Sequence, residues 1–229
     1  MHTSTPSNPA PRAFSPTRQR RKEARPQELL DAALDLFVER GYAATRCEDV
    51  AVRAGVSKGT LYLYYPSKEE LLKEVIRHNV IHPIVEGEGL ILGFEGPAPE
   101  LLARVLRMWW ERIGETRASG IVKLMTTEAR NFPEVAQFYV DEVIAPSNRL
   151  LAQVIQRGVD RGEFRAVDLP EVVHALVGPL VFLVLHKHSL GACSATYRLE
   201  PRAVIDALLD MVIHGLVPRA PATRRKLSR

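Results

Sequence analysis

The stretch TRCEDVAVRAGVSKGTLYLYYPSKEEL, residues 45–71, decides the fold of the amino-terminal part of this 229-residue chain. A short segment with apolar residues at helical spacing precedes Gly55, and a second one follows it. Gly55 can adopt the positive φ of a tight turn, and Val56 and Leu61 can fill the space between two crossing helices. This order of short helix, glycine turn and second helix is typical of a helix-turn-helix.

A longer helix is expected before this stretch. Apolar residues recur at helical spacing between Leu29 and Phe37, which predicts an amphipathic helix from about Pro26 that ends at Gly41. Thr45 and Glu48 form a capping-box pattern, so we expect the next helix to begin there.

Two more helix starts can be predicted from capping residues. Ser57 is the expected cap of a helix over residues 58–65, and Pro66 ends that helix. Ser67 and Glu70 repeat the capping-box pattern and begin a fourth helix.

The rest of the chain also has helical periodicity. His82-Pro83 is expected to end or shift the fourth helix, and the glycines and prolines between positions 87 and 99 predict a connecting loop. Further helices are expected over residues 100–116, 120–130, 133–161 with a kink at Pro146, 169–190, and 201–216. No stretch alternates as a strand, so the expected fold class is all-α.

Composition narrows the class of protein. The chain is 46% hydrophobic and 25% charged, which indicates a soluble globular protein. Its formal charge of +4 fits either an anionic partner or an ordinary solvated surface. Cys47 and Cys193 have no disulfide-scaffold or zinc spacing, so a reducing cytoplasm is expected. The start of the chain lacks a secretory apolar run, and the apolar stretch 175–185 is too short to span a membrane.

Both ends of the chain are expected to be disordered and basic. The tail over residues 1–22 ends in Arg18, Arg20, Arg21 and Lys22, and a second basic tail covers residues 219–229. The first tail either only increases solubility or forms an arm that contacts DNA phosphates.

The run GVSKGTLYLYY from Gly55 to Tyr65 resembles the recognition-helix signature of the TetR family of one-component transcription regulators. The resemblance is strong over residues 25–76. It implies a three-helix helix-turn-helix domain over residues 23–70 and a helical effector-binding and dimerisation domain over residues 71–218. It also implies a cytoplasmic homodimeric repressor that binds a palindromic DNA operator and leaves it when a small hydrophobic effector binds, with no cofactor and no membrane partner.

A recognition helix must offer hydrogen bonds, charge and apolar contacts to the major groove. Family analogy also puts Thr45 and Lys68 on DNA phosphates. The expected DNA contacts are Thr45, Arg46, Lys58, Gly59, Thr60, Tyr62, Tyr64, Tyr65 and Lys68. Two alternatives remain open, because Tyr65 before Pro66 can be a core residue and the two lysines can be solvated surface charges.

The carboxyl-terminal domain supplies the other expected sites. An apolar effector pocket is expected from Met108, Trp109, Met125, Phe132, Phe138, Tyr139 and Phe182. A four-helix dimer interface is expected from Leu176, Leu180, Leu183, Val184, Ile205, Leu208, Leu209 and Val212. The alternative for each of these residues is the core of its own chain.

Two rival functions stand beside this prediction. An enzyme would draw on His174, His186, His188 and Cys193, but His186 and His188 are two positions apart and face different sides of a helix, so no metal site is expected. The chain also lacks the GxxxxGK, GxSxG and GxGxxG motifs in their required contexts. The second rival is a DNA-binding protein without an effector, or an activator.

Overall fold

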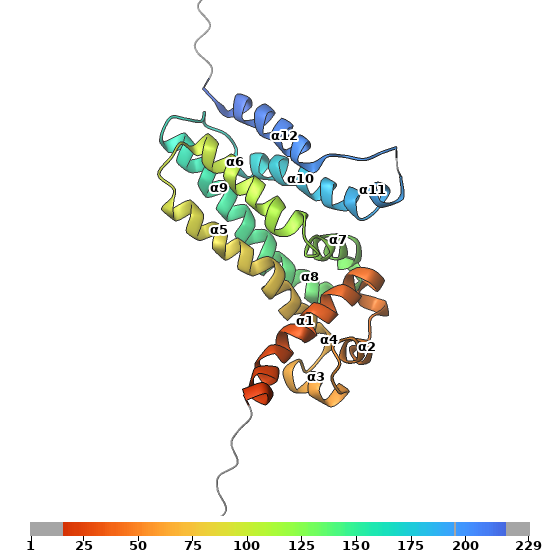
Figure 1. Cartoon of the computed structure of the whole chain (residues 1–229). Helices are drawn as coiled ribbons and strands as arrows, with labels where there is room; N and C mark the ends of the chain where they lie inside the picture. The colour runs from red at the N-terminus through yellow and green to blue at the C-terminus, as the bar shows by residue number, and fades with distance from the viewer. Residues whose placement is uncertain (1–15, 195, 219–229) are drawn as a thin grey trace, which may run out of the picture.

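The computed structural model describes residues 16–194 and 196–218, and these residues form helices and connecting segments without a strand (Figure 1). The expected all-α class is therefore confirmed. The amino-terminal unit consists of α1 (Pro16–Ala44), α2 (Cys47–Arg53), α3 (Lys58–Tyr64) and α4 (Lys68–Ile76). The following elements are η1 (Arg77–Ile81), α5 (His82–Gly93), α6 (Ala98–Trp109), η2 (Trp110–Gly114), α7 (Ser119–Glu128), η3 (Ala129–Asn131), α8 (Pro133–Tyr139), η4 (Val140–Ile144), α9 (Ala145–Asp160), α10 (Leu169–Lys187), α11 (Leu190–Cys193) and α12 (Pro201–Leu216).

Helix α1 begins earlier than the sequence predicts. It starts at Pro16 instead of Pro26, so residues 16–22 of the expected disordered tail are helical. Proline fits the first helical turn, and Arg, Gln and Lys are good helix formers that extend an existing helix at low cost. The remaining tail residues, 1–15 and 219–229, lie outside the described residues. Gly41, the predicted end of the helix, has a φ of 83° and kinks α1, and helical residues continue beyond it to Ala44.

The serine caps are confirmed. The Ser57 hydroxyl accepts a hydrogen bond from the Thr60 amide at 3.1 Å, and the Ser67 hydroxyl accepts one from the Glu70 amide at 3.1 Å. These bonds satisfy amide groups that the first turns of α3 and α4 leave unpaired.

The prediction of a loop between positions 87 and 99 is mostly wrong, because most of this segment is helical. Helices α4, η1 and α5 follow one another without a break over residues 68–93, and only Phe94–Pro97 separate α5 from α6. Gly87 is buried, and a Cβ there would lie 3.1 Å from the Met108 methyl group, so this glycine permits close helix packing instead of forming a turn. The domain border expected after residue 70 falls inside α4.

Three π-helical turns, η1, η2 and η4, interrupt the longer helices. Two of them come shortly before a proline, η1 before Pro83 and η4 before Pro146. Proline has no amide hydrogen for the helical ladder, and a wider turn adjusts the hydrogen bonds around it. The irregularity predicted at Pro146 therefore takes the form of the π turn η4.

The carboxyl-terminal part is a helical bundle. Helix α9 packs against α5, α6 and α10, and α12 packs on α6 and α10 at the end of the molecule farthest from α3 (Figure 1). Helix α1 packs against α4 and α2 within its own unit and against α7 of the bundle. The two units therefore meet along α1 and α7, and α4 also packs on α8.

The contact of α1 with α7 depends on a glycine. A Cβ at Gly120 would lie 2.3 Å from Cγ2 and 3.0 Å from Cβ of Val38, so the helices approach more closely than a side chain allows. An ion pair between Arg117 and Asp35 lies at the same contact.

We expect Gly120→Ala to lower the free energy of unfolding by about 1–3 kcal/mol, because the added methyl group forces two packed helices apart. Gly89→Ala is the matched control, since a Cβ at this exposed helical position meets nothing within 4 Å. The control should be neutral or slightly stabilising. Urea unfolding of both variants measures the difference, and equal effects would contradict the role of Gly120.

Candidate functional site

Helix α3 is fixed by its buried face and presents the opposite face to solvent. Leu61 is fully buried, and Gly55 has the positive φ of 66° that the turn before α3 requires. Val56 then donates its amide hydrogen to the Ala51 carbonyl at 2.9 Å, which joins the turn to α2. The exposed positions of α3 are Lys58, Gly59, Tyr62 and Leu63, with Thr60 and Tyr64 half-buried.

The polar groups on this exposed face contact one another. The Lys58 amine lies 2.5 Å from a carboxylate oxygen of Glu48 and 5.8 Å from the centre of the Tyr62 ring. The hydrogen bond between them raises the pKa of Lys58 and lowers that of Glu48. Both groups stay charged near neutral pH, and their exposure to water makes the pair weak and easily exchanged for another partner.

Thr45 does not have its expected role. Its side chain is 1% exposed, and the hydroxyl lies within hydrogen-bond distance of the carbonyls of Leu36, at 3.1 Å, and Gly41, at 2.7 Å. Helix α2 begins after Arg46 with no side-chain cap. Thr45 therefore holds the end of α1, and the predictions of a capping box and of a phosphate contact by this hydroxyl are corrected.

Lys68 also bonds within the chain. Its amine donates to the carbonyls of Tyr42, Ala43 and Thr45 at 2.8, 3.3 and 3.1 Å, and it lies 4.4 Å from the centre of the Tyr42 ring. An ammonium group has three hydrogens, so these carbonyls account for all of its donors. The expected phosphate contact is corrected to a cap that joins the start of α4 to the end of α1.

Tyr65 is a core residue, which was the open alternative. Its phenol is buried and donates to the Pro26 carbonyl at 3.3 Å, and burial raises its pKa to about 12. Arg46 is exposed and has no ion pair or side-chain hydrogen bond within the described residues. Of the nine expected DNA contacts, Thr45, Lys68 and Tyr65 thus point into the protein.

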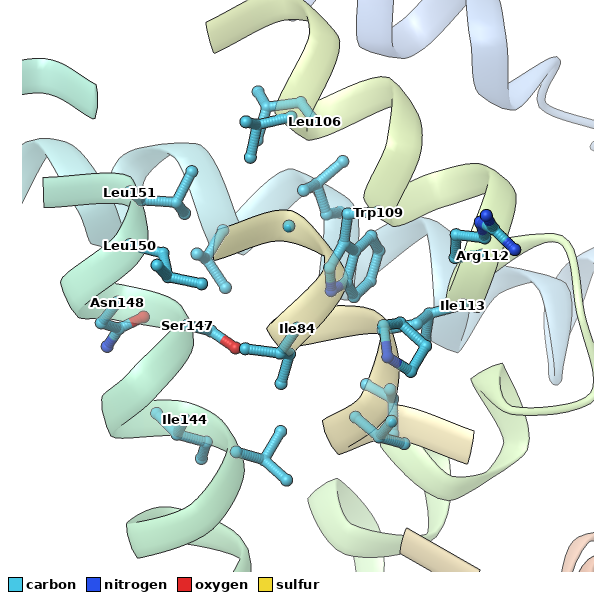
Figure 2. Close-up of a pocket in the computed structure, with 18 of the residues that line it drawn as sticks. Ile84, Leu106, Trp109, Arg112, Ile113, Ile144, Ser147, Asn148, Leu150 and Leu151 are labelled. Carbon is cyan, nitrogen blue, oxygen red and sulfur yellow. The ribbon is translucent and has the colours of Figure 1, made fainter. Parts of the chain in front are cut away.

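An apolar cavity of about 230 Å³ lies inside the bundle. Figure 2 shows side chains from α5, α6 and α9 around it, with the Trp109 indole between α6 and α5 and the Ser147 hydroxyl pointing toward Ile84. All three π turns contribute to the wall, η1 through Val80, η2 through Ile113 and η4 through Val143. The polar lining residues are Thr126, Arg112, Ser147, Asn148 and His174, with Tyr139 supplying a phenol.

Two features of the wall bear on what the cavity can hold. Arg112 is the only lining residue with a permanent charge, and its guanidinium pairs with Glu86 at 3.3 Å near the solvent. Burial raises the pKa of Tyr139, so its phenol stays protonated, and its hydroxyl makes no hydrogen bond within the described part of the chain. The cavity therefore offers several neutral donors in a largely apolar wall, the Tyr139 phenol among them, and one cation at its edge.

The predicted pocket residues divide into two groups. Met108, Trp109 and Tyr139 line the cavity. Phe132 instead stacks edge-on against Tyr42 with ring centres 4.4 Å apart. The other residues that do not line the cavity are Met125, which is buried in the core, Phe138, which lies under Lys73 and Arg77, and Phe182, which is 50% exposed.

The predicted dimer residues mostly face their own chain. Those buried in the core are Leu176, Leu180, Leu183, Val184, Ile205, Leu208 and Leu209, and Val212 is partly buried against it. Leu180 also lines the cavity. Periodicity selected the inner faces of these two helices, because the inner face of an amphipathic helix is the more regularly apolar one.

Comparison with known proteins identifies the family. Residues 29–75 match a family model described as bacterial regulatory proteins, tetR family, and residues 99–192 match one described as tetracyclin repressor-like, C-terminal domain. The chain is 30% identical over 154 residues to the HTH-type transcriptional repressor KstR2 of Rhodococcus jostii, covering 63% of this chain and 70% of that protein. This chain belongs to the TetR family. It is 29% identical over 166 residues to KstR2 of Mycolicibacterium smegmatis, covering 72% of this chain and 73% of that protein.

Solved TetR-type structures have the same fold. The Bacillus subtilis transcriptional regulator FadR in complex with stearoyl-CoA superposes with a TM-score of 0.69 at 21% identity, covering 83% of this chain and 98% of that one. TetR-family proteins are transcription regulators, so the chain is a regulator and not an enzyme.

The histidines of the rejected enzyme hypothesis have structural contacts. Nε2 of His186 lies 3.1 Å from the Tyr197 carbonyl, and Nε2 of His188 lies 2.9 Å from the Ser119 hydroxyl. Within the ranges that the structure describes, no three His, Cys, Asp or Glu side chains gather in a metal-binding group.

We expect Lys68→Ala to lower the free energy of unfolding by about 1–3 kcal/mol in the absence of DNA, because three carbonyls lose their donor. Lys58→Ala is the control, since Lys58 pairs only at the surface, and it should leave the unfolding midpoint nearly unchanged. Thermal unfolding of the two variants compares them. Equal midpoints for Lys68→Ala and the wild type would contradict the capping role.

Proposed function

We propose that this chain is a ligand-responsive transcriptional repressor that binds a palindromic operator as a dimer and is released by a small, largely apolar effector. The exposed face of α3 carries the proposal. It combines a cation, a phenol, an apolar side chain and a glycine that allows close approach, which suits base edges and backbone in a major groove.

Charge indicates which parts of the chain approach DNA. Residues 26–76 contain six Lys or Arg and nine Asp or Glu, a formal charge of −3, whereas residues 16–25 contain five basic residues and one acidic residue. Most cations of the unit have carboxylate or carbonyl partners, and Arg46 has none within the described residues. Phosphate binding is therefore assigned to Arg46, to the basic start of α1, and to Lys58 after it leaves Glu48.

Dimerisation is proposed through the outer faces of α10 and α12. The most apolar window of the segment Leu169–Cys193 has a mean hydropathy of 1.7, yet only 33% of it is buried in the single chain. Phe182 is 50% exposed on α10 and Met211 is 66% exposed on α12. Exposed small residues lie one or two helical turns from them, which lets a second copy approach closely: Ala175 and Gly178 on α10, and Ala203 and Ala207 on α12. Two recognition helices about 34 Å apart then match successive major grooves.

The cavity is the proposed effector site. Its wall suits a long apolar chain, Tyr139 can donate to an oxygen of the ligand, and Arg112 can hold an anionic end in place of Glu86. The structural similarity to a regulator solved with stearoyl-CoA supports an acyl thioester as the first candidate class.

Two routes connect the cavity to the DNA-binding unit. Val122 and Thr126 of α7 line the cavity, and the same helix contacts α1 through Gly120 and Val38. Val80 lines the cavity from η1, which continues directly from α4. A ligand that shifts either helix can change the position of α3, provided that it binds the shifted arrangement more tightly.

Operator binding tests the proposal. Fluorescence anisotropy with DNA flanking the coding region should find one fragment that binds tightly, with two chains per site and with affinity that falls as salt rises. Tyr62→Ala should weaken this binding at least tenfold. Tyr197→Ala, at an exposed position of the carboxyl-terminal domain, should not change it. Equal weak binding to every fragment, or one chain per site, would contradict the proposal.

Effector binding is tested with stearoyl-CoA. It should bind the wild type and release the operator, and Tyr139→Phe should bind it about 2–10 times more weakly, because one hydrogen bond is lost. Tyr197→Phe is the control for the same change on the surface. If stearoyl-CoA neither binds nor releases the operator, the acyl-thioester class is wrong, and operator binding unaffected by a panel of apolar ligands would favour an effector-independent regulator.

A further inference from the structure

Leu63 supplies the apolar side chain on the exposed face of α3. Leu63 is 85% exposed, more than any other large hydrophobic side chain in the described residues. Successive helix positions are 100° apart, so Lys58, Gly59, Tyr62 and Leu63 lie on one strip opposite the buried Leu61. Leu63 is therefore directed to the same side as the residues proposed to meet DNA.

The neighbours of Leu63 on this strip either contact other side chains or have no side chain. The Lys58 amine contacts Glu48 and lies over the Tyr62 ring, and Gly59 has no side chain to hold the helix away from a surface. Leu63 does not belong to the apolar side chains that pack on the core. It is thus the apolar group on this face that projects freely from the protein.

The chemistry of leucine limits what it can recognise. A leucine side chain neither donates nor accepts a hydrogen bond, and the thymine C5-methyl group is the apolar feature that base pairs present in the major groove. We propose that Leu63 is a specificity-determining residue that reads a thymine methyl group in each half of the operator, an inference that rests on the proposed function. Burial of the methyl group against Leu63 removes apolar surface from water and favours thymine over the other bases at that position.

A single exposed leucine is common on protein surfaces, so the test needs a matched leucine elsewhere. Leu92 on α5 is 80% exposed and belongs to the bundle instead of the DNA-binding unit. Leu92→Ala removes the same atoms as Leu63→Ala at nearly the same exposure. Neither change should alter the thermal unfolding midpoint.

The experiment has two arms. In the first, the wild type, Leu63→Ala and Leu92→Ala each select binding sites from random-sequence duplex DNA. The wild type and Leu92→Ala should select one consensus with a fixed thymine in each half-site, and Leu63→Ala should lose the preference at that position alone.

In the second arm, uracil replaces that thymine in the selected duplex, which removes only the methyl group. The wild type should lose about fourfold in affinity for each half-site changed, whereas Leu63→Ala should bind the thymine and uracil duplexes equally.

Two results overturn the inference in distinguishable ways. If the wild type selects no consensus, the proposed function fails and the inference falls with it. If the wild type selects a consensus that Leu63→Ala reproduces in full, or if uracil weakens both proteins equally, the repressor proposal stands and the role of Leu63 is wrong.

Discussion

The close approach of α1 to α7 constrains the rest of the molecule. It requires the absence of a side chain at Gly120, where Val38 occupies the space that a Cβ would take. Helix α1 also supplies much of the core of the DNA-binding unit, including the fully buried Leu29. The position of α3 relative to the bundle therefore depends on a contact in which neither helix can move without displacing the other.

Features that arise from local backbone chemistry were predictable from the sequence. Ser57 and Ser67 cap the helices that follow them, because a serine hydroxyl at the N-cap can accept an amide hydrogen three residues ahead within the same turn. Gly41 and Gly55 take the positive φ that kinks α1 and forms the turn before α3. These residues determine where the helices of the amino-terminal unit lie along the chain, which is why its fold could be predicted.

Features that depend on a distant partner were not predictable in the same way. Lys68 has the sequence context of a surface cation, and only the fold brings it to the carbonyls at the end of α1. Leu176 and Phe182 share an apolar helix, yet one is buried in its own chain and the other is half exposed. Helical spacing groups residues into faces, but which face meets the chain's own core is decided by the packing of the other helices.

The π turns give the cavity wall a property that regular helices lack. Each such turn holds a residue more than an α-helical turn, and η1 lies between the DNA-binding unit and the cavity. Rewinding η1 into an α-helical turn would rotate α4 by about 100° and shift it by about 1.5 Å relative to α5 without breaking the chain. The turn η1 joins α4 to α5 and thus contains one residue more than a regular α-helix needs. It lies beside the cavity proposed as the effector site.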